Sequence, residues 1–483
     1  MPRAYALALI ALLASPPLAA FSRTQGDSAA TPVSPVPALA DSLHGRTMTG
    51  NQSAAHAVGQ VLAINVLVNR FDAWALKEWW ARPRWRNWED NLRFGWVWDE
   101  DNFTTNMFAH PYHGGMYFNA GRANGLDFWE SAPLAFLGSW TWEYFGEKNR
   151  PSLNDFFMTS FGGIGLGEMF HRLSASIRDN TRHGAARTWR EMGALPFDPI
   201  GGLNRLLRGE WTRHEANPPE HDPGAYVFRV QAGARYTDGR LPGTPTSLVG
   251  VVVDLRYGNP FLRPYRAPFD VFGVRAILSS PGGLDVLRAS GRLFAKDLNR
   301  LGARHRHVFT INQRYDYIAN PAQSIGGQSV EFGIMSRWRL LKSKFGLRTQ
   351  AFGDVILLGA LDAPEAPDSS IGVGARTYDF GPGGGARAEV ALEYEGVTLL
   401  ALYGQTELVH TVSGASADHS IAFGGGELYV PLAGHIGLSL HATRFSRFSR
   451  YTDPGRPVDS RQFPEVRILV TWTAAGQPRP ASK

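Results

Sequence analysis

Apolar and polar residues alternate along much of the chain from residue 225 onward, and this alternation limits the possible folds most. In one clear example, Arg387 and Glu389 fall on one face while Ala388 and Val390 fall on the other. Successive side chains of a β-strand point to opposite faces, so this pattern predicts strands with one charged and one apolar face. About twelve such runs occur, near residues 225–237, 247–257, 269–280, 284–297, 304–318, 328–341, 344–358, 385–395, 397–410, 419–430, 435–448 and 464–473.

These runs predict a mainly β protein with an α-helical N-terminal part, built around a transmembrane antiparallel β-barrel of about 12 strands. Strands of roughly ten residues, an even number of them and one apolar face are typical of such a barrel. Lipid offers no hydrogen-bond partners, and a closed barrel pairs its backbone groups internally. A soluble β-sandwich or β-helix is the alternative. Aromatic girdles at the membrane surfaces are expected from Tyr236, Tyr257, Tyr315, Tyr317, Tyr394, Tyr451 and Trp472.

The charged faces of the runs carry both signs. A barrel of this size has a lumen wide enough for side chains or a small plug. Because cations and anions occur together, we expect ion pairs inside the barrel more than an open channel selective for one sign. The residues expected in the lumen are Arg229, Arg235, Arg256, Arg288, Arg292, Arg348, Asp254, Asp354, Glu389, Glu393 and Glu407.

The N-terminus has the features of a secretory signal peptide. Arg3 supplies a positive charge, residues 4–14 are apolar, and small residues suited to cleavage end at Ala20. We therefore expect a cleaved signal peptide at 1–20, a flexible leader at 21–52 and a location in the cell outer membrane; a short anchoring helix is the alternative. The absence of cysteine excludes a lipoprotein, disulfide bonds, cysteine-ligated zinc and thiol catalysis.

Residues 53–215 are predicted to form a helical domain, because Val58, Val61 and Leu62 begin an apolar pattern with helical spacing. Tryptophan and arginine then mix between residues 74 and 98. This mixture suits a membrane–water interface, or equally well cation–π packing in a soluble helical layer. We expect the domain to plug the lumen, or cap the periplasmic mouth, of a barrel at 225–473 that is followed by a tail at 474–483.

A cluster of polar residues lies on otherwise apolar helical segments between residues 106 and 174. Spacings of three or four residues place its members on common helix faces, and buried charges need partners. As a catalytic site, the cluster would use His110 or His113 as a general base that Glu143 orients. The other members, expected to bind a ligand or to form a buried polar cluster, are Tyr117, Asn119, Arg122, Ser139, Glu147, Glu168 and Arg172.

Structural explanations exist for the same residues. Candidate ion pairs are Arg122 with Glu143 and Glu168 with Arg172. The segment 151–155 matches a helix capping box, which accounts for Ser152 and Asp155 without any chemistry. The histidines can also simply bind backbone carbonyls.

Several kinds of site are absent or weakly supported. His110 and His113 lack the spacing of a HExxH motif, so no metal and no cofactor is predicted, although a His/carboxylate metal site fits the residue types. There is no GxSxG motif, and the glycine-rich segment 162–167 lacks the lysine of a phosphate loop. The net charge of +6 comes without a long Lys/Arg run, so nucleic acid is not expected as a partner. Outer-membrane lipid is the expected partner.

One family shares the pattern of this cluster. Its matching pieces are His110-Pro111-x-x-Gly114-x-x-Tyr117-x-Asn119, Arg122-x-x-Gly125, Gly138-Ser139-x-x-Trp142-Glu143, Glu147, Pro151-Ser152-x-x-Asp155 and Gly162-Gly163-x-x-x-Gly167-Glu168. On these pieces, within about residues 100–175, the chain resembles a bacterial family called domain of unknown function 3943. The resemblance implies a Gram-negative envelope protein in which a helical unit precedes a barrel-like half, and it implies no activity.

Three functions remain open at this point. The first is an envelope protein that handles lipid or a hydrophobic ligand, with the helices gating or plugging the barrel. The second is an outer-membrane enzyme, a hydrolase or transferase acting on lipid or cell-wall material, in which Arg122 binds an anion. The third is a purely structural barrel with an ion-paired plug.

Overall fold

The computed structural model describes residues 53–99, 101–218, 221, 224–238, 247–280, 283–300, 304–320, 323–340, 344–362 and 377–476. The predicted signal peptide at 1–20 and leader at 21–52 lie outside these residues, as do residues 477–483 of the predicted tail.

Twelve antiparallel strands form a closed barrel, which confirms the predicted fold class. Each strand pairs with its neighbours in sequence, and β1 closes the barrel against β12. The alternating runs form these strands because every backbone group finds a partner along the wall. The strands are β1 (Tyr226–Thr237), β2 (Ser247–Tyr257), β3 (Phe272–Ser279), β4 (Gly283–Asp297), β5 (His305–Asn320), β6 (Gln323–Arg339), β7 (Phe345–Asp362), β8 (Tyr378–Tyr394), β9 (Val397–His410), β10 (Ala417–Ala433), β11 (Ile436–Tyr451) and β12 (Asp459–Gly476).

The N-terminal part is helical. Its elements are α4 (Ala54–Phe71), η1 (Asp72–Leu76), α5 (Trp85–Phe94), η2 (Thr105–Ala109), α6 (His110–Ala123), α7 (Phe128–Phe145), α8 (Leu153–Phe157), η3 (Met158–Gly162), α9 (Gly163–Ile177), α10 (Gly184–Ala194) and α11 (Pro199–Leu207), where η marks a π-helical turn. Among the described residues, no helix combines the length and the hydropathy needed to cross a membrane.

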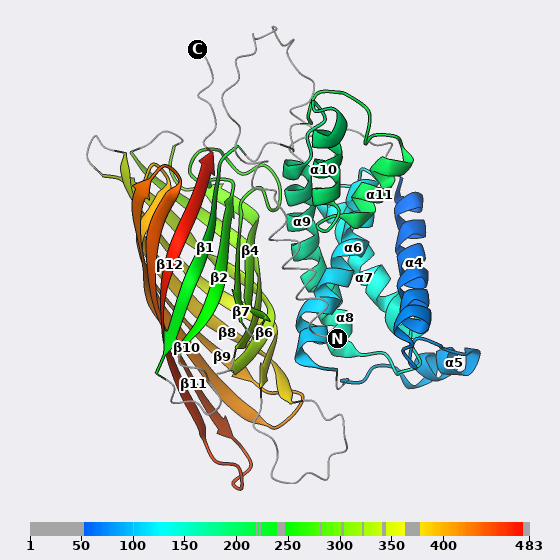
Figure 1. Ribbon diagram of the computed structural model, residues 1–483. Helices are drawn as coiled ribbons and strands as arrows, with labels where there is room; N and C mark the ends of the chain where they lie inside the picture. Colours follow the sequence, from blue (N-terminus) through cyan, green and yellow to red (C-terminus); the bar gives the residue numbers. More distant parts are fainter. Residues whose placement is uncertain are drawn as a thin grey trace.

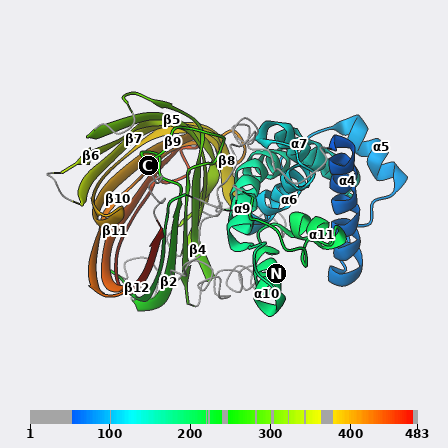
Figure 2. The same ribbon diagram turned by 90° about the horizontal axis from the view of Figure 1, so that it is seen from above.

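The helical domain lies beside the barrel wall and outside the lumen (Figures 1 and 2). Arg314 of β5 points into the lumen, where it binds Glu407 of the non-neighbouring strand β9. On the opposite face of β5, Gln313 and Tyr315 donate hydrogen bonds to backbone carbonyls of the helical domain. The predicted lumen plug or periplasmic cap is therefore corrected. The lumen is filled by its own charged side chains, while the outer wall offers apolar and aromatic ones for packing.

The main hydrophobic core lies between the helices and the outer face of the wall from β2 to β8. Tyr257, Tyr315 and Tyr317 belong to this core and are only 4%, 2% and 4% exposed. Their predicted place in an aromatic girdle is therefore wrong, because helices cover them. Phe128 of α7 stacks on Phe269, which precedes β3, with 5.8 Å between ring centroids.

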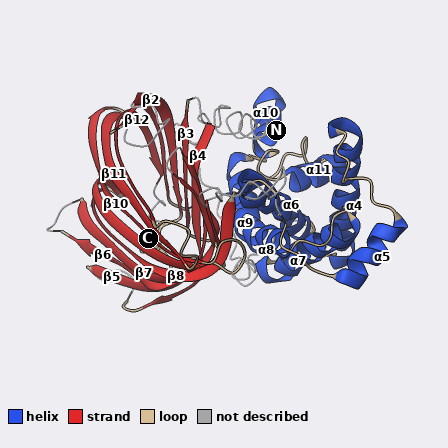
Figure 3. Ribbon diagram, turned by 90° about the horizontal axis from the view of Figure 1, so that it is seen from below, coloured by secondary structure: helices blue, strands red, loops and turns tan. Residues whose placement is uncertain are grey.

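On the side of the barrel away from the helices lie β10, β11 and β12 (Figure 3). The outer face of β6 to β12 carries an exposed apolar band. Its members alternate with lumen-facing polar residues, as the sequence pattern requires. The apolar band consists of Phe332, Ile334, Val355, Val390, Leu400, Leu402, Leu408, Leu428, Val430, Leu432, Ile436, Leu438, Leu440, Val466, Ile468 and Val470.

Glycines allow the central helices to cross closely. A Cβ atom on Gly163 would lie only 2.4 Å from the backbone carbon of Gly114, and one on Gly114 would lie 1.8 Å from the carbonyl oxygen of Thr159. Small residues at such crossings let two helix backbones touch. This contact brings the first turn of α6 against η3 and positions the polar cluster described below.

Candidate functional site

The predicted polar residues separate into two clusters inside the helical domain. We call the first the acid–histidine cluster; it holds His110, His113, Glu143 and Glu147, joined by Asp99, Asp101 and Asp155. We call the second the arginine cluster; it holds Arg122, Glu168 and Arg172.

His110 is held between two side chains of the segment that leads from α8 into η3. Its Nδ1 lies 3.1 Å from Thr159 Oγ1, and its Nε2 lies 3.5 Å from Asp155 Oδ1. The residue is 8% exposed, and this burial lowers the pKa of His110 to about 4. Its imidazole is therefore neutral at ordinary pH and carries a lone pair.

His113 lies one turn further along α6, among aromatic rings. Its ring centroid is 4.6 Å from that of Tyr117 and 5.0 Å from that of Trp142. Burial lowers the pKa of His113 to about 3, and the nearby His110 lowers it further in the same direction. Of the two predicted bases, His110 is thus the one that faces a carboxylate.

The two glutamates of α7 and the turn after it bind groups other than histidine. Glu143 Oε2 accepts a hydrogen bond of 2.8 Å from the backbone N–H of Ser152, and Glu147 Oε1 accepts one of 2.7 Å from Trp142 Nε1. Burial raises the pKa of Glu143 well above its usual range and that of Glu147 to about 8, and neighbouring carboxylates add to both shifts. In the described structure Asp155, and not Glu143, faces His110.

Sequence reasoning missed three aspartates of this cluster. Ser152 Oγ accepts a hydrogen bond of 3.2 Å from the backbone N–H of Asp155, which is one half of the predicted capping box. The other half does not form, because the backbone N–H of Ser152 donates to Glu143, and the Asp155 carboxyl group faces His110 instead. Asp99 and Asp101 belong to an acidic run just before the matching motif, and that run was the available signal. Among the described residues, no Lys or Arg pairs with Asp101, Glu143, Glu147 or Asp155.

The remaining predicted residues of α6 and α7 pack the domain. The Tyr117 hydroxyl donates a hydrogen bond to Asn65 of α4, and its ring lies where a Cβ on Gly138 would be. Ser139 donates to a backbone carbonyl at 3.5 Å, and Asn119 is 1% exposed. These side chains hold α4, α6 and α7 together around the acid–histidine cluster.

The arginine cluster joins two helices to the barrel. Glu168 is fully buried between Arg122 Nε at 2.9 Å and Arg172 Nε at 2.8 Å. Arg172 also donates a hydrogen bond of 2.8 Å to the carbonyl of Pro268, in the loop between β2 and β3. The Glu168–Arg172 pair thus forms as the spacing predicts, whereas Arg122 pairs with Glu168 and not with Glu143.

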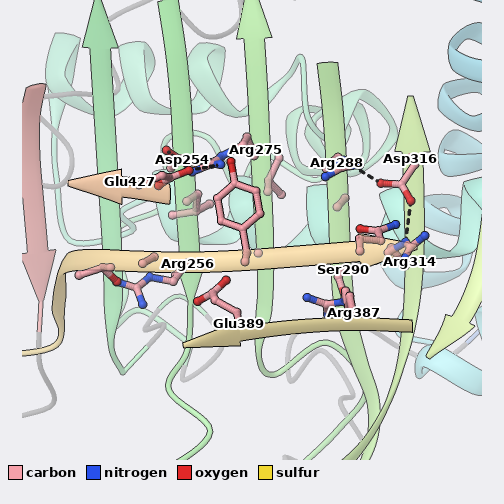
Figure 4. A pocket seen from close by; sticks show the side chains of 18 of the residues that line it. Asp254, Arg256, Arg275, Arg288, Ser290, Arg314, Asp316, Arg387, Glu389 and Glu427 are labelled. Carbon is pink, nitrogen blue, oxygen red and sulfur yellow. Dashed lines mark hydrogen bonds and ion pairs between the residues drawn. The ribbon is translucent and has the colours of Figure 1, made fainter. Parts of the chain in front are cut away.

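The lumen is crossed by arginine–carboxylate pairs, as the mixed charges predict. Arg256 of β2 lies 2.9 Å from Glu393 of β8, although these strands are not neighbours. Figure 4 shows Arg288 pointing toward Asp316, at 3.1 Å. Cavities of about 300 Å³ and 250 Å³ remain between these side chains. Side chains of opposite walls therefore divide the lumen into small polar spaces.

Comparisons with known proteins agree with the family resemblance. The family described as "Domain of unknown function (DUF3943)" matches residues 95–200, which confirms the predicted relationship over this segment. No protein of curated function matches the chain.

Solved structures similar to this chain include outer-membrane proteins. OmpT of Vibrio cholerae is 9% identical over 52% of this chain and 98% of its own, with a TM-score of 0.22. OpdL of Pseudomonas aeruginosa is 11% identical over 52% and 98%, with a TM-score of 0.19. The CymD monoaromatic hydrocarbon channel is 8% identical over 53% and 89%, with a TM-score of 0.18.

Proposed function

We propose that this protein binds lipid in the bacterial outer membrane, and that the helical domain, not the lumen, is the part that handles it. The main support is the position of that domain beside the barrel wall, alongside the strands that would cross the bilayer (Figure 1). A lipid at this place would lay its tails along apolar helix surfaces. Its headgroup would lie near the polar residues that the same helices enclose.

The outward surface of the helical domain supports contact with lipid tails. In α4, which lies far from the barrel (Figure 2), Leu62, Val66 and Leu67 are 45%, 60% and 66% exposed. The helix has no Asp, Glu, Lys or Arg before Arg70. In α7, Trp129 is 60% exposed. Exposed apolar surfaces of this kind mark contact with a membrane or a partner.

One end of the domain supports contact with headgroups. There Arg70 lies 5.8 Å from the Trp74 ring centroid, and Lys148 lies 5.8 Å from that of Trp79. Both tryptophans are largely exposed, at 70% and 65%. Tryptophan sits at the membrane–water boundary, and cations there meet anionic lipid. This end includes α5, and the charged helix α10 lies at the opposite end (Figure 1).

The lumen offers little to an apolar ligand. Its cavities are bounded by Arg–Glu and Arg–Asp pairs, such as Arg275 with Glu427 at 2.5 Å. An apolar molecule would have to separate these pairs and leave the charges without partners, which is costly in a low-dielectric space. The lumen therefore favours a structural role for the barrel and supports the proposal of lipid handling on its outer side.

An enzyme that modifies lipid is the second candidate, and the geometry of His110 favours it. Its neutral imidazole faces the carboxylate of Asp155 at 3.5 Å. A histidine oriented by a neighbouring group can take a proton from water or from a hydroxyl group. In this case His110 would be the base and Asp155 would have the orienting role predicted for Glu143.

Comparative lipid profiling of outer membranes tests this proposal. A deletion strain would carry the wild type, His110→Ala, or the control His410→Ala, which removes an exposed histidine that is paired with Asp418. We expect the deletion to change the lipid profile, the wild type and the control to restore it, and His110→Ala to fail although the barrel is present in normal amounts. Identical profiles in all strains would contradict lipid handling. If His110→Ala restores the profile, the enzyme candidate is contradicted and lipid binding without catalysis remains as the proposed function.

A further inference from the structure

We propose that Asp101, His110 and Asp155 bind a divalent metal ion. Each residue offers one ligand atom, and these three atoms all lie within 4.8 Å of one another. Ligand atoms bound to one metal at about 2.1 Å lie up to about 4.2 Å apart. Small side-chain rotations, well within the freedom of Asp101 at the protein surface, therefore suffice to bring all three onto one ion.

His110 is already oriented as a ligand. In the tautomer that donates Nδ1–H to Thr159 Oγ1 at 3.1 Å, the lone pair of Nε2 points to Asp155 Oδ1 at 3.5 Å. Nε2 is buried and makes no hydrogen bond. Two lone pairs facing one another repel unless a cation or a proton lies between them. A histidine that is fixed through one nitrogen and binds a metal through the other is the usual arrangement in metal sites.

The surrounding amides hold the carboxylates in place. Asn154 Nδ2 donates a hydrogen bond of 3.0 Å to Asp155 Oδ1 and another hydrogen bond to Asp99 Oδ1. Asn106 Nδ2 donates to Asp99 at 3.3 Å. Ligating carboxylates are commonly fixed by such neighbouring donors. Both asparagines are fully buried, so the cluster is built rather than formed by chance at the surface.

A cation would also balance the charge of the acid–histidine cluster. Glu143 and Glu147 lie close enough to Asp101 and Asp99 for their charges to interact. Several carboxylates in one buried place are costly without a counter-charge. Two carboxylates and one imidazole suit Zn²⁺ or Mn²⁺, whereas Ca²⁺ prefers an all-oxygen site.

The site also contacts the barrel. The Tyr378 hydroxyl, at the start of β8, donates a hydrogen bond of 2.8 Å to the backbone carbonyl of Asp101. It accepts another from Asn106 Nδ2 at 2.5 Å. A metal at Asp101 would therefore fasten the helical domain to the wall. Metal binding does not depend on the proposed lipid function. A bound metal would occupy the Nε2 lone pair of His110. In a lipid-modifying reaction, a metal-bound water, and not His110, would then be the base.

Metal binding by the purified full chain in detergent micelles tests the proposal. The protein is stripped with a chelator, and the binding of Zn²⁺, Mn²⁺, Ca²⁺ and Mg²⁺ is measured by calorimetry, with bound metal counted by mass spectrometry. We expect one equivalent of Zn²⁺ or Mn²⁺ per chain and a rise in the melting temperature on binding. His110→Ala and Asp155→Asn should weaken binding by at least about 100-fold, since each removes a ligand.

Two further variants keep the test decisive. Asp101→Asn changes an exposed residue of a connecting segment and leaves the buried packing intact, so it reports on ligation even where a core variant fails to fold. His410→Ala removes an exposed histidine that pairs with Asp418 outside the cluster and should bind metal as the wild type does. Stoichiometric binding that survives in Asp101→Asn and His110→Ala would overturn the proposal, as would a wild type that binds none of the four ions. Either result would contradict the metal site alone, because the lipid function is tested separately by the lipid profiles of the strains.

Discussion

At the scale of single residues, Glu168 is a strongly constrained charge of the helical domain. It is fully buried and shared by Arg122 at 2.9 Å and Arg172 at 2.8 Å. A carboxylate between two guanidinium groups is stabilised by both of them, and removing it leaves two buried cations without the partner that they share.

Glu168→Gln keeps the shape of the side chain and removes its charge. We expect it to lower the free energy of unfolding of the helical domain by about 3 kcal/mol, because a buried ion pair has lost one partner. Urea titration followed by the helical circular dichroism signal measures this change.

The matched control is Glu395→Gln, whose partner Lys344 lies 2.7 Å away in an exposed ion pair. Water already solvates both of these charges, so the control should leave the titration unchanged. Equal titration curves for Glu168→Gln and the wild type would show that the arginine cluster does not stabilise the domain.

Residue spacing predicted the Glu168–Arg172 pair because both members lie on one helix, where positions four apart always meet. Residue spacing could not predict that Arg122 forms an ion pair with Glu168, or that Asp155 faces His110. Those contacts join different helices, and their distances depend on the close crossing at Gly114 and Gly163. The predicted capping box offered Asp155 a complete local explanation, but the backbone N–H of Ser152 donates to Glu143, a residue of another helix.

At the scale of elements, the strands were predictable because apolar and polar residues alternate along most of the wall. The position of the helices was not. Tyr315 and Tyr317 alternate with Arg314 and Asp316 just as lipid-facing residues would, and nothing local distinguishes an aromatic residue under lipid from one under a helix. Gln313 lies on the same face and is a polar exception among these apolar residues. Its amide donates a hydrogen bond to the backbone carbonyl of Phe161 in the helical domain.

Cysteine labelling tests whether α4 faces lipid. The chain has no native cysteine, so single variants report one position each. In lipid nanodiscs, Leu67→Cys should react with a water-soluble maleimide about tenfold slower than Thr212→Cys, because the reactive thiolate forms only where water reaches it. Both positions are exposed in the protein itself.

Labelling of the two variants unfolded in urea supplies the intrinsic rates. After this correction, equal rates in nanodiscs would place α4 in water and remove the main support for lipid contact at the helical domain. A slow rate for Leu67→Cys that becomes fast after unfolding would instead support contact with lipid tails.

At the scale of the whole molecule, the barrel is closed along its wall and bridged across its lumen. Side chains from one wall reach non-neighbouring strands of the opposite wall: Arg229 of β1 binds the carbonyl of Thr398 on β9, and Arg256 of β2 binds Glu393 on β8. Bridges of this kind draw the two walls together and leave cavities of about 300 Å³ and 250 Å³ between them. We therefore expect the barrel to act as a rigid support for the helical domain.

This arrangement predicts low ion conductance for the wild type in planar bilayers. The double variant Arg256→Ala/Arg275→Ala removes two bridges and several polar barriers, so its conductance should rise several-fold. The control Lys344→Ala changes an exposed cation at the end of the wall and should conduct as the wild type does. A wild type that already conducts as well as the double variant would mean that the bridges do not close the lumen. In that case the lumen, and not the outer wall, would have to be considered as the path of the ligand, because the charged pairs would then line an open channel rather than fill it.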